Sequence, residues 1–410
     1  MTPWPTKKLG EICEENIKSP FKVENASNSG EYPFFTSGEN VLTHDDYLVD
    51  GENIFLSTGG YANVKYYNGK ASYSTDTWSL RVKNNLTKYV FYQILVRLKY
   101  IDEVLFRGSG LRHLQKKEFL TLEIPLPPLH IQQKIVKILD TIQSAIDIQE
   151  KIIEKTKELK KSLMNLLFHY GIKALSIKLL TSYRVGELES EELKKLGLKL
   201  KKTEIGEIPE HWEVVKLGDE RLFEIKLGGT PKTGEPKYWN GRIYWITPND
   251  LSKLTSPFIR STERTITEEG LRAGSNILPA GSIILSTRAP IGYVGIVETD
   301  MAFNQGCKGI VIKNKNILNI FVYYYLNKKS LNLHELGTGS TFRELSTEDL
   351  KKFKLPLPPL PEQQEIAEIL QTIDQKIEIE KRKKELYEEL FKTLLNKIMS
   401  QEIDVDLLDY

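Results

Sequence analysis

The 410-residue sequence has little cysteine and no long apolar run, and each shortage excludes a class of protein. Its two cysteines, Cys13 and Cys307, lie far apart in the chain, so they indicate neither a disulfide framework nor a cysteine zinc motif. No apolar stretch is long enough to span a membrane, and the opening residues do not resemble a signal peptide. We therefore expect a cytoplasmic protein that makes no membrane contact.

The motifs of nucleotide and methyl-transfer chemistry are also missing. There is no Gly-x-x-x-x-Gly-Lys phosphate loop, and the only Pro-Pro pairs are flanked by leucine, unlike the Asn/Asp-Pro-Pro-Tyr type of motif of amino-methyltransferases. A loose nuclease-like pattern, Pro209-Glu210 before Glu224-x-Lys226, uses combinations that are common in lysine-rich chains. No metal-ligand spacing joins the six histidines, which are His44, His113, His130, His169, His211 and His334. We expect no catalytic residue, no metal site and no cofactor bound by this chain.

An excess of positive charge is absent as well. The 57 lysines and arginines nearly balance 55 acidic residues, which gives a net charge of +2. A basic surface for nucleic acid must therefore be local. The near-neutral balance leaves open an alternative, a structural adaptor that holds two protein partners and does not bind DNA.

The main feature present is a stretch that occurs twice, from Leu126 to about Tyr170 and from Leu357 to about Met399. Each copy opens with Leu-Pro-Pro-Leu and continues with a glutamine pair, Gln132-Gln133 or Gln363-Gln364, at a constant offset of 231 residues. Apolar residues then recur with a 3.5–3.6 period, which predicts a helix of about 39 residues and nearly 60 Å. Two such helices are expected to bury their apolar seams on one another as a coiled coil.

The middle of each predicted seam is polar. It contains Gln149 and Thr156 in the first copy, and Glu380 with Lys383 and Lys384 in the second. Two interpretations stay open at this point, a weak hydrated patch and a device that fixes the helix register.

The sequence before each helix is also duplicated. Trp4-x-x-x-Lys8-Leu9-Gly10 resembles Trp212-x-x-x-Lys216-Leu217-Gly218 at an offset of 208, and Gly108-Ser109-x-x-Arg112 resembles Gly339-Ser340-x-x-Arg343 at 231. The second copy therefore has a net 23 extra residues (231 − 208), which we expect on surface loops, partly within 228–239 and 244–248. The expected boundaries are a first domain 1–125, first helix 126–170, connector 171–208 with a possible short helix at Glu189–Leu198, second domain 209–356, second helix 357–400 and tail 401–410.

Short β-like runs bounded by glycine, asparagine and aspartate fill each domain, with few long helices between them. This mixture predicts an α+β fold rather than a doubly wound sheet. The expected architecture is two similar mixed α/β domains joined by two long helices that form an antiparallel coiled coil, with an internal pseudo-twofold duplication.

These features together resemble a known family. The paired Trp…Leu-Gly openings, Gly228-Gly229-Thr230-Pro231 followed by Trp245-Ile246, Asn304-Gln305, and the two Pro-Leu-Pro-Pro-Leu…Gln-Gln helix starts are similar to the DNA-specificity subunit of type I restriction–modification systems. The first domain departs from the family pattern, because it has Asn25–Gly30 in place of Gly-Gly-Thr-Pro.

The resemblance implies a non-catalytic subunit with two target-recognition domains, one for each half of a bipartite asymmetric DNA site. It implies docking of two methyltransferase subunits and, in the full complex, of restriction translocase subunits. S-adenosylmethionine, ATP and Mg are then expected on those partners.

Base readout needs hydrogen-bonding side chains on loops or strands, together with cations for the phosphates. The residues that we select as DNA-binding on this basis are Ser57, Thr58, Tyr61, Lys65, Arg107, Ser109 and Arg112 in the first domain, and Thr230, Lys232, Ser286, Thr287, Arg288, Asn304, Gln305, Ser340, Thr341 and Arg343 in the second.

Structural alternatives exist for several of these residues. Arg112 and Arg343 occupy equivalent positions, which suits a phosphate contact or a structural salt bridge better than base-specific readout. Asn304-Gln305 suits a turn cap equally well. Trp239 and Trp245 are expected in the core.

Overall fold

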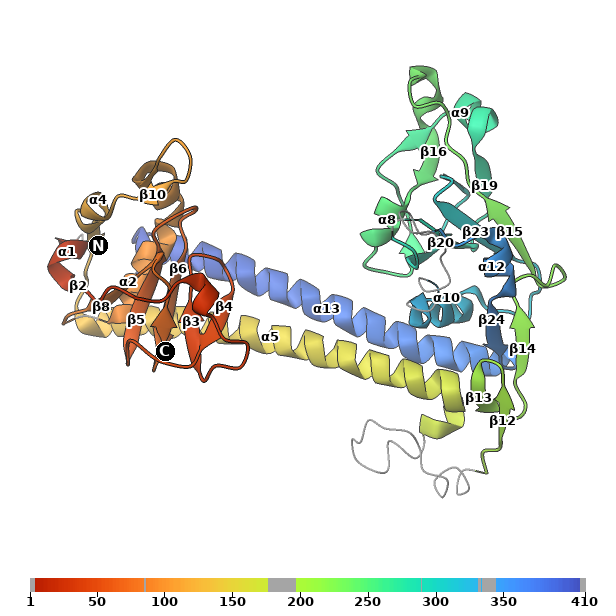
Figure 1. The fold of residues 1–410 in the computed structure, drawn as a ribbon, viewed down its shortest axis with the longest axis horizontal. Helices are drawn as coiled ribbons and strands as arrows, with labels where there is room; N and C mark the ends of the chain where they lie inside the picture. The colour runs from red at the N-terminus through yellow and green to blue at the C-terminus, as the bar shows by residue number, and fades with distance from the viewer. Residues whose placement is uncertain are drawn as a thin grey trace. The chain divides into compact units, whose positions relative to one another are not determined.

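The computed structural model describes residues 4–84, 86–175, 197–288, 290–330, 333 and 344–405. The chain divides into two compact units, one of Met1–Glu150 with Arg382–Tyr410 and one of Lys151–Lys381. Each unit mixes sheets with helices (Figure 1), which confirms the mixed fold class. No helix within the described residues is long and apolar enough to cross a membrane.

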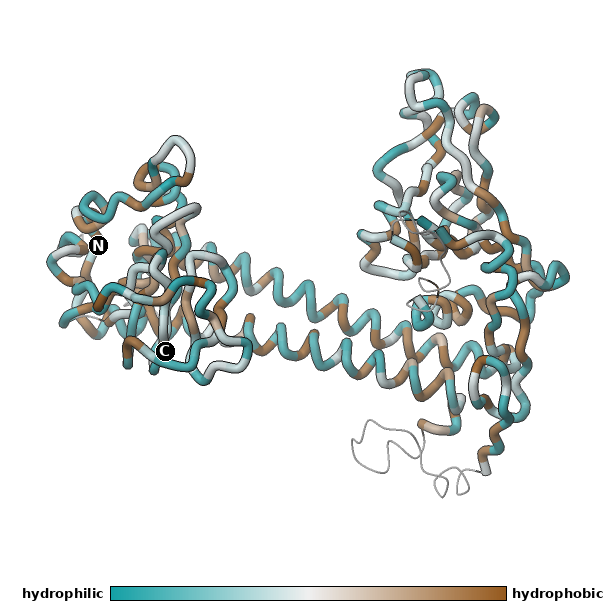
Figure 2. The backbone as a smooth tube through the Cα atoms, viewed as in Figure 1, coloured by the Kyte–Doolittle hydropathy of each residue, from teal (hydrophilic) through white to brown (hydrophobic). Residues whose placement is uncertain are grey.

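The first unit is built on an antiparallel four-stranded sheet with β5 at its centre. Its strands, in spatial order, are β2 (Cys13–Glu15), β8 (Thr77–Val82), β5 (Glu52–Ser57) and β6 (Val64–Asn68). Helix α2 (Thr87–Val96) packs on this sheet and contributes Tyr89, Val90 and Ile94 to the core that contains Ile54 and Leu80. Figure 2 shows hydrophobic and hydrophilic segments interspersed along this domain.

Smaller elements complete the first domain. A three-stranded sheet has the order β4 (Val41–His44), β3 (Tyr32–Phe35) and β7 (Ser72–Tyr73). Two-stranded pairs are β1 (Thr6–Lys8) with β11 (Glu123–Pro125), and β9 (Phe106–Arg107) with β10 (His113–Leu114). The short helices are α1 (Leu9–Ile12), η1 (Val23–Asn25), α3 (Leu98–Tyr100), η2 (Ile101–Leu105) and α4 (Lys116–Leu120).

The second unit repeats this plan with additions. Its main sheet has the order β15 (Phe223–Leu227), β23 (Cys307–Ile312), β20 (Ile283–Ser286), β21 (Val294–Val297) and β17 (Phe258–Ile259). The second sheet has the order β18 (Thr265–Ile266), β16 (Trp239–Ile246), β22 (Met301–Phe303) and β19 (Asn276–Leu278). The remaining elements are η3 (Ile172–Ala174), the pair β12 (Leu200–Thr203) and β13 (Gly206–Pro209), the pair β14 (Glu213–Lys216) and β24 (Lys354–Leu357), η4 (Pro236–Tyr238), α8 (Pro248–Ser252), α9 (Glu268–Gly274), α10 (Asn319–Lys328) and α12 (Thr347–Lys352).

The strand registers locate the extra residues of the second domain. Phe34 pairs in parallel with Ser72, and Trp245 pairs in the same way with Ala302, so the first members of the two pairs differ by 211 residues. In the main sheets, Ile54 and Ile283 occupy equivalent positions and differ by 229. Most of the addition (229 − 211) therefore lies after Trp245, within α8, β17, β18 and α9. Three extra residues (211 − 208) lie before Trp245, which leaves room for the expected addition within the loop of 228–239. The expectation of a surface loop at 244–248 is wrong, because these residues end β16 and begin α8.

Two long helices, α5 (Leu129–Tyr170) and α13 (Leu360–Met399), follow the two domains. In the first unit, Ile135 and Leu139 near the start of α5 share a core with Leu395 and Ile398 near the end of α13. In the second unit, the end of α5 shares a core with the start of α13 through Leu167 and Leu370. The helices therefore pair antiparallel within each unit (Figure 1).

The polar seam positions differ in burial: Gln149 and Glu380 are buried, Thr156 and Lys384 are half-buried, and Lys383 is exposed. Gln149 is 6% exposed and Glu380 is 2% exposed. Glu380 forms an ion pair with Lys376 one turn earlier, and Lys384 Nζ lies 3.2 Å from the Glu150 carboxylate. The predicted polar break in the apolar seam is therefore present in the folded chain. The expected connector helix lies outside the described residues, apart from Gly197 and Leu198.

The duplicated glutamine has the same structural task in both copies. The Gln132 side chain accepts a hydrogen bond from Leu86 N at 3.2 Å and donates one to Pro127 O at 2.9 Å. Gln363 accepts from Leu318 N at 2.8 Å and donates to Pro358 O at 2.8 Å. Each glutamine thus ties the first turn of a long helix to the start of α2 or α10.

Candidate nucleic-acid interface

Two loops of the first domain lie together at the end of β5. One loop follows Ser57 and the other joins β9 to β10. Leu114 N donates to Thr58 O at 3.0 Å, and Gly60 N donates to Arg112 O at 2.9 Å. These backbone hydrogen bonds hold the loops as one surface, which contains most of the residues predicted to bind DNA in this domain.

A buried serine at the end of the central strand shapes the loop in each domain. Ser57 Oγ donates to Tyr61 O at 2.6 Å and accepts from Asn63 N at 2.8 Å. Ser286 Oγ repeats the arrangement, donating to Pro290 O at 2.8 Å and accepting from Tyr293 N at 2.9 Å. Both side chains are at most 3% exposed. The structure therefore assigns these two hydroxyls to loop positioning, because neither faces solvent.

The arginines of the first domain are paired with carboxylates. Arg112 Nη2 lies 3.1 Å from each carboxylate oxygen of Asp102, and its Nη1 donates to Asp102 O at 3.0 Å. The N–H of Ala62 and the Arg112 guanidinium hold the pKa of Asp102 below its usual value. Arg107 forms a bidentate pair with Glu118 at 2.9 and 2.8 Å. The salt-bridge alternative for Arg112 is thus present in the free chain, and its contact with DNA stays a prediction.

The remaining predicted residues of the first domain differ in exposure. Thr58 is half-buried and its Oγ1 donates to Asp76 O at 2.9 Å. Lys65 is half-buried, donates to Thr36 O at 3.2 Å, and has its pKa lowered by burial. Tyr61 and Ser109 are exposed.

The second domain has the same loop junction, reinforced by a buried lysine. Leu345 N donates to Thr287 O at 3.0 Å, which matches the bond between Leu114 and Thr58. Lys308 is 4% exposed, and its Nζ donates to Leu345 O at 2.6 Å and to Thr287 Oγ1 at 3.4 Å. Burial lowers the pKa of Lys308, while the nearby carboxylate of Glu344 opposes this shift. Thr287 is buried, so it also positions the loop.

Glu344 links this junction to the surface. Its carboxylate lies 3.9 Å from Lys308 Nζ and 2.9 Å from Arg288 Nη2. Arg288 is exposed, and its ion pair with Glu344 holds the guanidinium at the surface. The buried Lys308 in turn helps to position the Glu344 carboxylate. Three predicted residues lie just before Glu344 in the sequence but outside the described residues, namely Ser340, Thr341 and Arg343. His334 also lies outside the described residues.

The Gly-Gly-Thr-Pro loop is held in place by the two tryptophans of β16. Trp245 Nε1 donates to Gly229 O at 3.0 Å, and Trp239 Nε1 donates to Lys232 O at 3.1 Å. Both indoles are buried, which confirms that they belong to the core. A Cβ at Gly228 would lie 2.0 Å from Asn304 O, so only glycine fits there.

The polar residues on this loop also meet a turn from another strand. The Thr230 hydroxyl bonds to the Gln305 side chain, and Asn304 Oδ1 accepts from Gly306 N at 2.9 Å. Asn304 therefore caps the turn, as its structural alternative predicted. Lys232 and Gln305 are exposed beside the half-buried Thr230. This part of the site joins residues that are 75 positions apart in the sequence.

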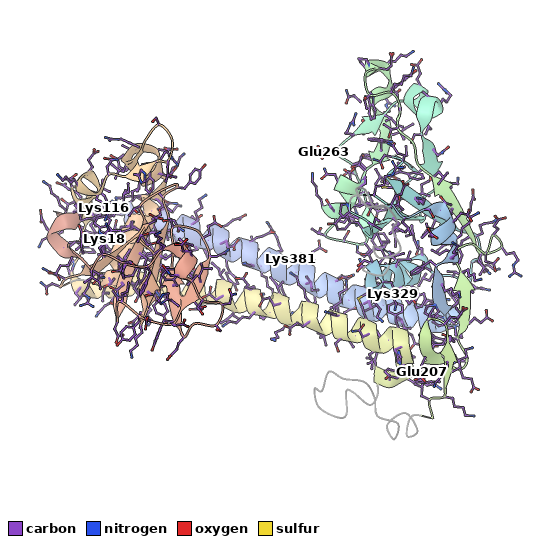
Figure 3. All side chains as sticks on the ribbon, in the orientation of Figure 1. Lys18, Lys116, Glu207, Glu263, Lys329 and Lys381 are labelled. Carbon is purple, nitrogen blue, oxygen red and sulfur yellow. The ribbon has the colours of Figure 1, made fainter. Side chains whose placement is uncertain are left out.

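Some exposed cations that no sequence motif predicts lie against tryptophan rings in the two domains. The Arg264 guanidinium carbon lies 3.7 Å from the Trp239 ring centroid and 5.3 Å from that of Trp245, and the side chain is exposed. In the first domain, Lys116 Nζ lies 4.6 Å from the centroid of the Trp78 ring. Burial lowers the pKa of Lys116, and the positive charge of Lys18 lowers it further (Figure 3). No sequence motif marks Lys116 or Arg264, because each lies against a tryptophan that is distant in the chain.

No cluster of three or more potential metal ligands occurs among the described residues. The loop junctions carry hydrogen-bonding and cationic side chains. Such a surface can recognise a polyanion by shape and hydrogen bonding.

Comparisons with known proteins identify the family. The model of the type I restriction modification DNA specificity domain matches residues 1–158 and 209–389. The MjaIX specificity subunit of a type I restriction enzyme from Methanocaldococcus jannaschii is 40% identical over 199 residues, 47% of this chain and 45% of that protein. The MjaVIII specificity subunit of the same organism is 27% identical over 435 residues, which span 99% of this chain and 94% of its own length.

The fold agrees with these sequence matches. The crystal structure of a type I restriction–modification S subunit from M. genitalium has a TM-score of 0.61 at 17% identity, covering 97% of this chain and 98% of that one. The family model matches well over half of the chain, in both of its domains. The chain therefore belongs to the type I restriction–modification DNA specificity family.

Proposed function

We propose that this chain reads a bipartite, asymmetric DNA site for a type I restriction–modification complex, with one domain for each half of the site. The observation that supports this proposal is one loop framework built twice with different side chains. Thr58 and Leu114 in the first domain form the same backbone bond as Thr287 and Leu345 in the second. The contact residues around this shared framework differ, so the two half-sites are expected to differ and the whole site to be non-palindromic.

The long helices serve as a spacer and as a dock for two methyltransferase subunits. Large apolar side chains remain exposed to solvent on these helices. The solvent-facing side of a paired helix normally carries charged and polar residues. In the first unit these include Leu386 and Leu390, which are one turn apart on α13. In the second unit they include Ile152 and Leu159 on α5, spaced by two turns. Helices of partner subunits would cover these residues.

The chemistry belongs to the partner subunits in this proposal. Methyl transfer from S-adenosylmethionine takes place on the methyltransferase subunits, and ATP- and Mg-dependent steps take place on restriction translocase subunits. This chain positions the partner subunits on the DNA site. Its carboxylates and lysines at the loop junctions hold the loops in place. DNA contact is proposed for the exposed candidates, which are Tyr61, Arg107, Ser109, Lys232, Arg288 and Gln305.

The proposal is tested by co-expression with its methyltransferase subunit and by sequencing of the methylated sites. We expect two short specific blocks separated by an unspecified gap. A continuous or palindromic site, or methylation without sequence preference, would contradict the proposal.

Two further measurements separate the chain from its partners. Native mass spectrometry with saturating partner is expected to give two methyltransferase subunits per chain, because two similar units offer two similar docking sites. The purified chain alone should transfer no methyl group from S-adenosylmethionine above contaminant background. A one-to-one complex would count against the duplicated dock, and methyl transfer by the chain alone would refute its non-catalytic role.

A further inference from the structure

The two most exposed large apolar side chains in the described part of the chain belong to two neighbouring loops of the first domain. Tyr61 is 77% exposed and Leu111 is 65% exposed. Tyr61 belongs to the loop after β5 and Leu111 to the loop between β9 and β10, and the backbone bonds of Gly60 and Leu114 join these loops. Exposed apolar surface on a rigid support is typical of a binding site.

The exposure of Tyr61 does not result from a loose loop. Its carbonyl oxygen accepts from Ser57 Oγ at 2.6 Å, and the next residue, Ala62, donates its N–H to Asp102 at 2.7 Å. The Arg112 guanidinium carbon lies 5.0 Å from the centroid of the Tyr61 ring, and Asp102 also binds this guanidinium. One carboxylate therefore fixes both loops and places a cation against one side of the ring.

The position of Leu111 depends on glycine. Gly108 has φ of +150°, and a Cβ there would lie 2.5 Å from Leu111 O, so the turn excludes other residues. A Cβ at Gly59 would lie 3.8 Å from Leu111 Cδ2, which shows that the leucine side chain covers Gly59. Gly60 and Gly110 face open space. The backbone next to Tyr61 and Leu111 carries no side chains at Gly60 and Gly110, so a flat partner can approach it closely.

Resting on the proposed function, we propose that Tyr61 and Leu111 form a wedge that enters the DNA base stack at or beside the half-site read by the first domain. Apolar side chains inserted between base steps unstack them and bend the duplex. The faces of the bases are apolar and flat, so they suit an aromatic ring and a leucine side chain better than phosphates do. The Arg112 guanidinium, which Asp102 holds against the ring, supports Tyr61 in its exposed position.

The second domain supports the assignment independently. Pro290 occupies the position of Tyr61, because its carbonyl accepts from Ser286 Oγ at 2.8 Å as that of Tyr61 accepts from Ser57. Pro290 is also exposed. An apolar residue thus stands at the same place on both copies of the framework, beside loops whose other residues differ. Proline is one of the side chains that proteins use as a wedge in DNA.

The test uses the full chain in its complex with methyltransferase subunits and a duplex that contains the methylated site found by sequencing. 2-Aminopurine replaces single bases in and beside each block, excluding the base that is methylated. We expect the wild-type complex to raise 2-aminopurine fluorescence several-fold at one step of the first block. The Y61A/L111A variant should lose this signal and bind the duplex about tenfold more weakly, while Y61F should retain both properties.

Tyr47→Ala is the matched control, because Tyr47 is an exposed tyrosine at the opposite end of β5 in the same domain. It should leave fluorescence and affinity unchanged. If wild type binds and methylates its site without unstacking any such step, the wedge is refuted while the proposed function stands. Loss of the methyltransferase subunits from Y61A/L111A would assign the surface to a protein partner and also refute the wedge. Absence of specific DNA binding by the wild-type complex would instead refute the proposed function.

Discussion

Replacing Gln363 with leucine should loosen α10 in the second unit and leave the first unit intact. Gln363 is fully buried, and its side chain makes hydrogen bonds of 2.8 Å from Leu318 N, 3.0 Å to Asn316 O and 2.8 Å to Pro358 O. Leucine preserves the volume of the side chain and the helix propensity but removes all three bonds. Leu318 is the residue before the first turn of α10, so its N–H has no replacement within that helix.

The expected cost follows from these bonds. Three hydrogen bonds at about 1 kcal/mol each, with an added penalty for the buried N–H, give about 3–5 kcal/mol. This is a large part of the 5–15 kcal/mol that stabilises a typical domain. Amide hydrogen exchange in α10 should therefore accelerate by about two to three and a half orders of magnitude, since each 1.4 kcal/mol is tenfold. Exchange is the suitable measurement, because a chain of two units need not melt in one transition.

Two controls make this result specific. Gln364→Leu changes the exposed glutamine of the same pair and should leave exchange in α10 unchanged. Gln132→Leu removes the equivalent bonds to Leu86 N and Pro127 O, so it should loosen α2 alone. Acceleration of less than tenfold in α10 of the Gln363→Leu variant would refute the proposed role of the buried glutamine.

Three further predictions concern recognition and pH. Removing one heptad from both long helices in register shortens each helix by about 10 Å, which equals the rise of about three base pairs of DNA. Sequencing of the methylated sites should then show a shorter gap between two unchanged blocks. A constant gap would exclude the helices as the spacer. If the stacked Arg264 guanidinium reads a base, Arg264→Ala should lower the discrimination between bases at one position of the second block by about 1–3 kcal/mol and leave the first block unchanged. Arg264→Lys should not restore this discrimination. Full restoration by lysine would instead indicate a contact that depends on charge alone. Because the folded-state pKa of Asp102 is lowered, its stabilisation is present above its unfolded pKa and is lost as pH falls through the folded value. Exchange at the Ala62 amide should therefore stay protected at about pH 5–6 and lose protection only below about pH 4, and Asp102→Asn should remove that dependence; an unchanged profile in the variant would disprove it.

The long helices and several strands were predictable because their signals are local. The apolar period placed helices at 126–170 and 357–400, and the structure has them at Leu129–Tyr170 and Leu360–Met399. The difference at the start is three residues in each case, because the two prolines precede the helix. Among the short β-like runs expected in the first domain, the one at Asn53–Ser57 corresponds to β5 (Glu52–Ser57). Period and punctuation are properties of neighbouring residues, so a sequence alone contains them.

The direction of each candidate side chain was not predictable in the same way. Ser57 and Thr58 are adjacent, yet one hydroxyl is buried under a loop and the other is half-exposed. The difference depends on strand alternation and on partners such as Tyr61 O, which the fold brings close. Arg264 was missed for a related reason, since its support comes from Trp239, 25 residues earlier in the sequence. A motif scan weighs residue types, whereas these roles depend on which face of a strand a residue occupies.

The antiparallel pairs at the base of each domain have a consequence for how such chains evolve. β1 pairs with β11 in the first unit, and β14 pairs with β24 in the second, so each domain begins and ends at the same seam. Beside the seam, Leu9 N bonds to Leu122 O at 2.9 Å and Leu217 N bonds to Phe353 O at 3.0 Å, in the same arrangement. Two genetic crossovers in the codons for one seam would exchange a whole domain and leave the long helices with their original attachment. New specificities can thus arise by recombination in a single generation, without passing through intermediates whose loops match neither the old site nor the new one.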